Sequence, residues 1–180
     1  IARLSDRAPV AAGQSPPPSG AAPAWTAGSV LDLLRREQFA EALRELPPEA
    51  SADPDALLLR AVLLTNSGDR SDAEQACRTL LAMDDLHAGA HYLMALCRER
   101  AGDLSGALEH DQAAVYLDAS FAMPRLHWAL IARRAGDLDT ARAEMRRALD
   151  LLSREDASRI LLFAGGFNRD TLARLCRAEL

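Results

Sequence analysis

RAGDLSGALEH (Arg100–His110) and RAGDLDTARAE (Arg134–Glu144) stand 34 residues apart and share six of their eleven residues. A weaker copy, NSGDRSDAEQA (Asn66–Ala76), lies another 34 residues upstream. The glycine of each copy falls at the same place in the period: Gly68, Gly102 and Gly136. Self-similarity at a period of this size is typical of an array of stacked units and not of one compact core.

Each unit divides at its glycine into two stretches with apolar residues at helical spacing. Glycine suits the left-handed position that ends the first helix, and the aspartate after it can cap the second. Because one pair of helices cannot bury its apolar face alone, neighbouring units must stack. Small residues are expected where the two helices approach closely: Ala61, Ala73, Ala95, Ala107, Ala129 and Ala141. Large apolar residues are expected to fill the remaining space: Leu63, Leu80, Leu96, Tyr116, Trp128, Leu130 and Leu149.

The chain before the first regular unit has two parts. Residues 1–24 are rich in Pro, Ala and Gly and predict a flexible linker. Together with Ile1 as the first residue, this linker suggests a fragment with a folded part upstream. Residues 25–53 predict a degenerate opening pair of helices, with a turn at residues 36–38 and a stop at Pro47-Pro48.

Three regular units and a tail follow. The units that fill residues 54–153 are predicted over 54–87, 88–121 and 122–153. Residues 154–180 break the period and predict capping helices that cover the last exposed face of the array. Gly165-Gly166 is expected to end the first capping helix, and Asn168 to cap the second. We expect Leu172 and Leu175 to lie on one side of that last helix.

Composition excludes several functional classes. A formal net charge of −5 argues against a general nucleic-acid binder, which needs a basic face. No stretch approaches the ~18 apolar residues of a membrane span, so no membrane insertion is expected. The three cysteines form no CxxC pair, and their odd number favours a reducing, cytoplasmic location over a disulfide framework.

The positions of the small residues carry a family resemblance. A helix-turn-helix unit of 34 residues with small residues near its eighth, twentieth and twenty-seventh places resembles the tetratricopeptide repeat. The matching residues are Ala95, Gly102, Ala107 and Ala114 in the second unit, Ala129, Gly136, Ala141 and Ala148 in the third, and Ala61, Gly68 and Ala73 in the first, which has Leu80 at the last place. The resemblance implies an all-α fold, a right-handed α-solenoid of helix-turn-helix units closed by C-terminal capping helices.

A narrower resemblance covers Glu109–Leu180. The phrases LDASFAMPRLH, from Leu117, and SREDASRILLFAGGFNRDTLARLCRAEL, from Ser153, are similar to the C-terminal repeat region of bacterial chemotaxis receptor methyltransferases that carry a tetratricopeptide extension. Such an enzyme transfers a methyl group from S-adenosylmethionine to glutamate side chains of chemoreceptors. Its catalytic domain would lie upstream of Ile1, so the resemblance assigns no catalytic and no cofactor-binding residue to this chain.

Few residues suggest chemistry of their own. No G-x-G-x-x-G follows a strand pattern, which argues against a nucleotide or S-adenosylmethionine site here. His87 and His91 have the spacing of two metal ligands, but no third ligand completes a familiar set, so no metal site is predicted. We expect Cys77 and Cys97 to be buried small hydrophobes. The carboxylate pairs are expected to be solvated or to cap helices: Asp84-Asp85 and Glu155-Asp156.

The remaining signal is a groove for a protein partner. In this repeat type the first helix of each unit lines the concave wall, and the phase assigns to it Leu58, Val62, Thr65, Asn66, Tyr92, Leu96, Glu99, Arg100, Met123, Leu126, Leu130, Arg133 and Arg134. The wall is largely apolar with arginines at one rim, a pattern that favours an amphipathic helix or an acidic extended peptide. The same arginines also stabilise helix C-termini through the helix dipole without any ligand.

The function predicted is therefore protein recognition within a chemoreceptor methyltransferase. The array would target the enzyme to a chemoreceptor or regulate its action there. Three alternatives stay open: docking on the parent's own methyltransferase domain, binding of another signalling protein, and a scaffold that dimerises through Leu172 and Leu175. An enzyme in its own right is disfavoured by the lack of a nucleotide loop.

Overall fold

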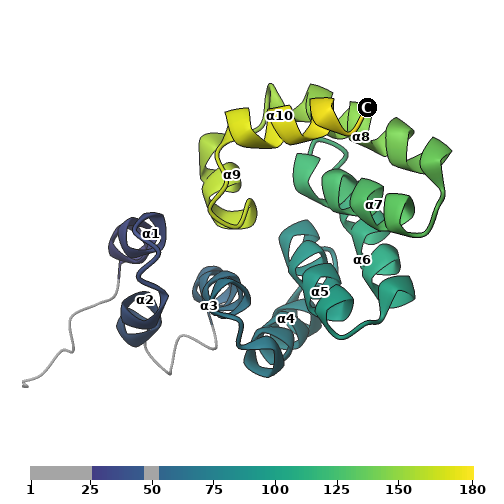
Figure 1. Ribbon diagram of the computed structural model, residues 1–180. Coiled ribbons are helices and arrows are strands. Elements are labelled where there is room, and N and C mark those ends of the chain that lie inside the picture. The colour runs from purple at the N-terminus through teal and green to yellow at the C-terminus, as the bar shows by residue number, and fades with distance from the viewer. Residues whose placement is uncertain (1–25, 47–52) are drawn as a thin grey trace, which may run out of the picture.

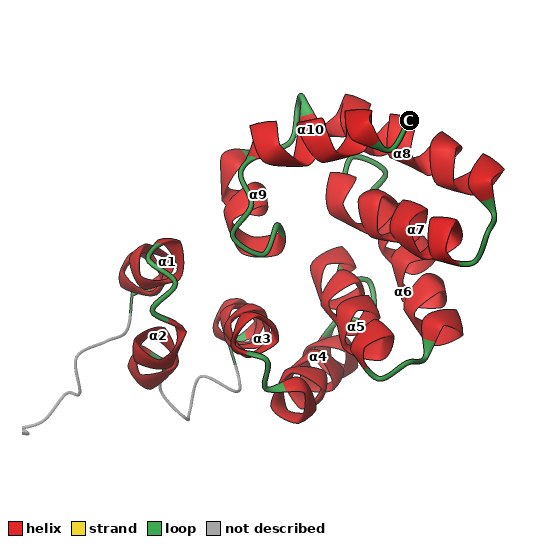
Figure 2. Cartoon of the chain, in the orientation of Figure 1, coloured by secondary structure: helices red, strands yellow, loops and turns green. Residues whose placement is uncertain are grey.

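A computed structural model describes residues 26–46 and 53–180. Within these residues the chain forms helices joined by turns and contains no strand (Figure 2). The predicted linker, residues 1–24, and the stop at Pro47-Pro48 lie outside the described residues.

Ten helices follow one another in the described part of the chain. Their bounds are α1 Ala27–Arg35, α2 Phe39–Glu45, α3 Pro54–Ser67, α4 Arg70–Met83, α5 Ala88–Arg100, α6 Leu104–Leu117, α7 Ala122–Arg134, α8 Leu138–Leu152, α9 Ala157–Phe163 and α10 Arg169–Ala178. The three pairs α3–α4, α5–α6 and α7–α8 occupy the three regular units of the sequence.

The pairs stack side by side into a curved array, the α-solenoid that the repeat predicts (Figure 1). Helices α3, α5 and α7 line its inner side, while α4, α6 and α8 lie outside. Each predicted small residue sits in a buried helix contact, and Ala61, Ala95 and Ala129 are fully inaccessible. Close approach of the helices thus depends on side chains no larger than a methyl group.

The prediction for one large residue is wrong. Tyr116 was expected to fill space between helices, yet 88% of it is exposed, near the end of the outer helix α6. Leu63 and Leu80, in contrast, are fully buried. The helical phase of Tyr116 points its ring to solvent, because the buried face of α6 passes through Ala107, Asp111 and Ala114.

All three turns inside the units have the expected left-handed glycine, with φ of 90° at Gly68, but the expected aspartate cap forms at only two of them. Gly102 and Gly136 both have φ of 83°, a left-handed conformation that costs a side-chain-bearing residue more than glycine. The carboxylates of Asp103 and Asp137 each accept a hydrogen bond from the backbone amide of the third residue of the next helix. Asp69 makes no such capping bond with the described residues, and its carboxylate accepts the hydroxyl of Ser67 instead.

The opening pair packs onto the first regular unit. Val30 and Ala42 are fully buried and belong to the same core as the repeats. The turn between α1 and α2 has no glycine, and Glu37 takes the left-handed conformation there with φ of 58°. A non-glycine residue in this conformation is uncommon, so the opening pair keeps the turn geometry of a repeat without its usual residue.

The tail only partly follows the prediction. Helix α10 packs against α8 and covers the end of the array, as expected for a cap (Figure 1). Helix α9 does not continue the stack, because it turns inward and lies inside the curve, where it also contacts α3. Gly165 and Gly166, with φ of 60° and 87°, separate the two helices, and the side chain of Asn168 caps α10. Leu172 is buried in the core and is therefore not available to a dimer contact.

Candidate protein-binding groove

The inner side of the array contains a pocket of about 410 Å³. Eight of the predicted groove residues line it: Thr65, Asn66, Tyr92, Leu96, Arg100, Met123, Leu126 and Leu130. Its other wall comes from the tail, through Leu162, Phe163, Ala164, Gly165, Phe167, Leu172 and Leu175. We call this space the concave pocket. It is mostly apolar, and Phe167 at its edge is 59% exposed.

The other five predicted groove residues lie outside the pocket. Val62 is fully buried in the core, and Leu58 lies by a shallow depression on another side of Phe163. Glu99, Arg133 and Arg134 take part in ion pairs at the inner rim. Eight of the thirteen predicted residues thus face one pocket, while the prediction for Val62 is wrong because its side chain packs into the core.

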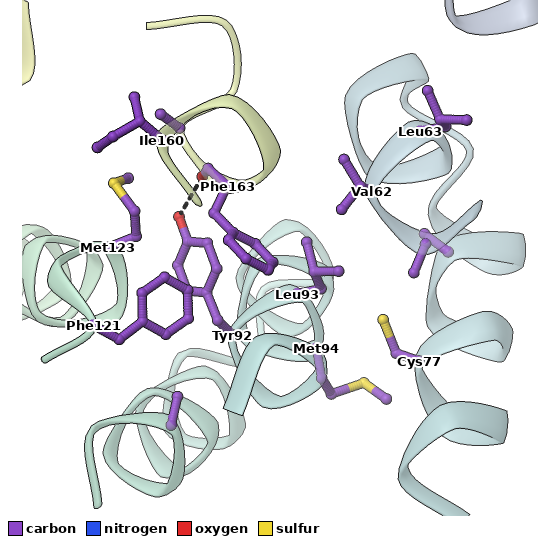
Figure 3. Packing of buried hydrophobic residues seen from close by; sticks show 14 of the residues in the cluster. Val62, Leu63, Cys77, Tyr92, Leu93, Met94, Phe121, Met123, Ile160 and Phe163 are labelled. Carbon is purple, nitrogen blue, oxygen red and sulfur yellow. Dashed lines mark hydrogen bonds between the residues drawn. The ribbon is translucent and has the colours of Figure 1, made fainter. Parts of the chain in front are cut away.

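Aromatic rings anchor α9 to the inner wall. Tyr92 on α5 packs edge-to-face against Phe121 at 5.4 Å and against Phe163 of α9 at 6.0 Å between ring centroids. The Tyr92 hydroxyl donates a hydrogen bond of 3.3 Å to the backbone carbonyl of Phe163 (Figure 3). Burial raises the pKa of the Tyr92 phenol, so the hydroxyl stays protonated and remains a donor.

The arginines of the predicted rim already have partners within the chain. Arg100 donates to the backbone carbonyl of Thr65, and Arg134 forms an ion pair with Glu99. Arg133 pairs with Glu179, just after α10. An acidic ligand would have to compete with these internal partners, so apolar contact dominates what the concave pocket offers.

A buried polar network lies beside the concave pocket, and the sequence reasoning missed it. His127 lines the pocket, and its Nδ1 lies 2.7 Å from Oδ2 of Asp111. On its other side, Nε2 lies 3.0 Å from Oε2 of Glu99. Asp111 is fully buried, and its Oδ1 has no hydrogen-bond partner among the described residues. A buried carboxylate in an apolar helix is the signal that could have found this network.

The network shifts the pKa of each of its members. Burial lowers the pKa of His127, but hydrogen bonds and charge from Asp111 and Glu99 outweigh it, so the net pKa is raised. Burial raises the pKa of Asp111 to about 6, although His127 opposes the shift. For Glu99, burial is outweighed by hydrogen bonds from Arg134 and His127, and its pKa is lowered. Hydrogen bonds to the two carboxylates therefore favour the protonated imidazole, and the network joins α5, α6 and α7 through Glu99, Asp111 and His127.

A second polar cluster fixes the start of the tail. Oε2 of Glu155 accepts a 2.8 Å hydrogen bond from the backbone amide of Ala122, the first residue of α7. Oε1 of Glu155 pairs with Arg159 at 3.1 Å, and Arg159 also pairs with Asp118 at 2.9 Å. The guanidinium of Arg159 lies 4.2 Å above the ring of Phe121. Glu155 thus caps α7 from another part of the chain, since Phe121 has no side chain that can.

The candidate metal and thiol residues have structural roles. Nδ1 of His87 accepts a hydrogen bond from the backbone amide of Ala90 and so caps α5. Nδ1 of His91 lies 2.9 Å from Nδ1 of His110. The two predicted histidines are therefore not brought together, and the described residues contain no group of three or more side chains that could hold a metal. Cys77 and Cys97 are buried, as predicted. A hydrogen bond with Cys97, together with burial, raises the pKa of the Cys77 thiol.

Comparisons with solved structures find other helical repeats. The crystal structure of PcrH, a Pseudomonas aeruginosa protein, in complex with the chaperone binding region of PopB superimposes with a TM-score of 0.58 at 21% identity, over 71% of this chain and 94% of that one. The Yersinia enterocolitica type III secretion translocator chaperone SycD gives 0.57 at 18% identity, over 71% and 90%. MamA gives 0.56 at 15% identity, over 84% and 86%.

The chain has a tetratricopeptide-like helical repeat fold. At these identities the likeness shows the fold alone. No protein-family model and no curated protein matches the chain. Among the described residues no helix is long and apolar enough to cross a membrane.

Proposed function

We propose that the concave pocket binds a segment of a partner protein. The observation that carries this proposal is an apolar pocket of about 410 Å³ whose walls come from three successive inner helices and the tail. Two proteins of the same fold support it, since PcrH was crystallised with the chaperone binding region of PopB and SycD with a peptide of the translocator YopD. A pocket of this kind recognises apolar anchor residues, with a few polar groups to orient them.

We further propose that the partner is a chemoreceptor and that the array guides a methyltransferase to it. This rests on the resemblance of Glu109–Leu180 to the repeat extension of chemotaxis receptor methyltransferases. Methyl transfer from S-adenosylmethionine then belongs to a domain outside these residues, and the array supplies recognition. The internal ion pairs of Arg133 and Arg134 make apolar contact the main source of affinity in this proposal.

The test is calorimetric titration with a soluble cytoplasmic fragment of a chemoreceptor. Phe167→Ala removes an exposed aromatic ring from the pocket edge and should weaken binding about tenfold or more, as expected for an aromatic anchor. Tyr116→Ala removes an exposed aromatic ring from the outer helix α6, away from the pocket, so it is the matched control and should leave affinity unchanged.

The outcomes separate the two halves of the proposal. Binding that is lost in a double Arg133→Ala, Arg134→Ala variant, whose two residues lie outside the pocket, but unaffected by Phe167→Ala would place recognition at the rim instead of the pocket. No binding of the receptor fragment would reject the chemoreceptor. The isolated methyltransferase domain of the parent would then be the next partner to titrate.

A further inference from the structure

Helix α9 lies against the same inner wall that lines the concave pocket. It lies inside the curve of the array, between the inner helices, and not in the stack (Figure 1). Ile160 and Phe163, three residues apart on one face of α9, are buried against the inner wall. We propose that α9 is an intramolecular ligand of the groove, and that the protein partner is a short helix with the same pattern, which displaces α9.

The inner wall recognises three features of α9. An aromatic slot formed by Tyr92 and Phe121 holds the Phe163 ring, whose centroid lies 5.0 Å from that of Phe121. Gly89 forms the floor of this slot, because a Cβ atom there would lie 2.8 Å from Cζ of Phe163. Figure 3 shows the ring of Phe163 directed between Tyr92 and Leu93. The backbone carbonyl of Phe163 accepts the hydrogen bond from the Tyr92 hydroxyl.

The second and third features are a basic and an aliphatic residue. Arg159 pairs with Asp118 of the repeat array and lies over the Phe121 ring. Ile160 follows it and packs into the same core. The pattern recognised is therefore a basic residue, an aliphatic residue directly after it, and an aromatic residue three positions further on, all on a single turn of helix.

The surroundings of α9 favour its displacement. A helix of seven residues has little stability of its own and depends on its contacts. It is followed by Gly165 and Gly166, whose exposed left-handed turn lets α9 move without disturbing α10. Space remains on both sides of it: the concave pocket on one, and on the other a pocket of about 420 Å³ bounded by α1, α2 and α9.

This inference rests on the proposed function, since it names the chemistry and the regulation of the same groove. A helix that satisfies the three features and also fills the concave pocket would make more contacts than α9 does. Partner binding then requires release of α9. The apparent association constant for the partner equals the intrinsic constant multiplied by the fraction of molecules in which α9 is undocked.

The test uses the full chain and a fluorescent peptide with the sequence of Ser153–Asn168. In the wild-type chain α9 competes with the peptide at high effective concentration, so binding should be weak. Phe163→Ala in the chain weakens α9 docking and should raise the affinity for the peptide at least tenfold. The Tyr116→Ala chain should behave as wild type, and a peptide with alanine at the position of Phe163 should bind neither chain.

Hydrogen exchange provides a second measurement that does not depend on the folding of a variant. Excess peptide should speed amide exchange across Ala157–Phe163 of the wild-type chain and leave the outer helices unchanged. Equal peptide affinity for wild type and Phe163→Ala, or binding without faster exchange in α9, would overturn the proposal. A wild-type dimer formed by exchange of α9 between copies would overturn the assignment to a separate partner.

The receptor fragment distinguishes this inference from the proposed function. If the fragment binds the wild-type and Phe163→Ala chains equally, α9 is no competitor, and only the further inference fails. If the fragment binds neither chain while the peptide still prefers Phe163→Ala, the groove and its internal ligand stand, and the chemoreceptor proposal fails.

Discussion

Removal of the Glu155 carboxylate should destabilise the start of α7, which is distant from Glu155 along the sequence but bonded to it in the fold. Glu155→Ala leaves the buried amide of Ala122 without its acceptor, 33 residues upstream. A lost charge-assisted hydrogen bond to a buried donor costs about 1.5 to 3 kcal/mol. The half-buried Arg159 loses one of its two carboxylates, which adds at most about 1 kcal/mol. Together these give an expected loss of about 1.5 to 4 kcal/mol in the free energy of unfolding.

Urea denaturation followed by far-ultraviolet circular dichroism measures this loss. Trp128 lies on α7, the helix that Glu155 caps, and in a Trp25→Phe background its fluorescence gives a local probe of the same transition. Glu155→Gln keeps an oxygen that can accept from the Ala122 amide and removes only the charge, so it should cost about half as much. A Glu155→Ala variant within about 0.5 kcal/mol of wild type would refute the reasoning, because α7 would then need no cap from the tail.

Three further changes test other parts of the structure. Leu63→Ala removes a fully buried side chain and should lower the free energy of unfolding, measured by urea denaturation, by about 2 to 5 kcal/mol. Leu86→Ala, at a position 67% exposed, should stay within about 0.5 kcal/mol of wild type. Gly102→Ala forces a side chain into a left-handed turn with φ of 83° and should cost about 1 to 2 kcal/mol. Gly28→Ala, in the first turn of α1 with no described atom within 4 Å of the added carbon, should be neutral or slightly stabilising in the same assay. The raised pKa of His127 means that the folded chain binds its proton more tightly than the unfolded chain, so this contribution is full below the ordinary pKa of 6.5 and is lost as pH rises through the folded-state pKa. The melting temperature should therefore fall from about pH 6.5 to pH 8.5 in wild type and fall less in His127→Gln; an equal slope in both would contradict the role of the imidazole.

Much of the fold could be predicted because its determinants are local and repeated. The glycines at 34-residue intervals mark the turns, and the small residues at fixed places mark where helices touch. Helical phase placed Tyr92 and Leu126 on the inner wall, and both line the concave pocket. The prediction failed for Tyr116, because it was assigned to the space between helices as a large apolar residue, while the buried face of α6 passes through Ala107, Asp111 and Ala114.

The contacts of the tail could not be predicted because they join residues far apart in sequence. ILLF, Ile160–Phe163, is apolar on every face, so its pattern does not say which surface it covers. Nothing near Glu155 in the sequence indicates that it caps a helix 33 residues upstream. The partners of Arg133 and Arg134 are equally remote, and charge patterning alone suggested a free rim where the structure has ion pairs.

The position of α9 has a mechanical consequence. An array in which each unit contacts only its neighbours can bend and twist, because no contact joins units that are distant from one another. Helix α9 comes after the last unit and yet contacts α3 of the first, and so it acts as a tie across the arc. While it is in place, the curvature of the array is held fixed. When it leaves, the array gains compliance, and the groove can widen or narrow to match the thickness of whatever enters it.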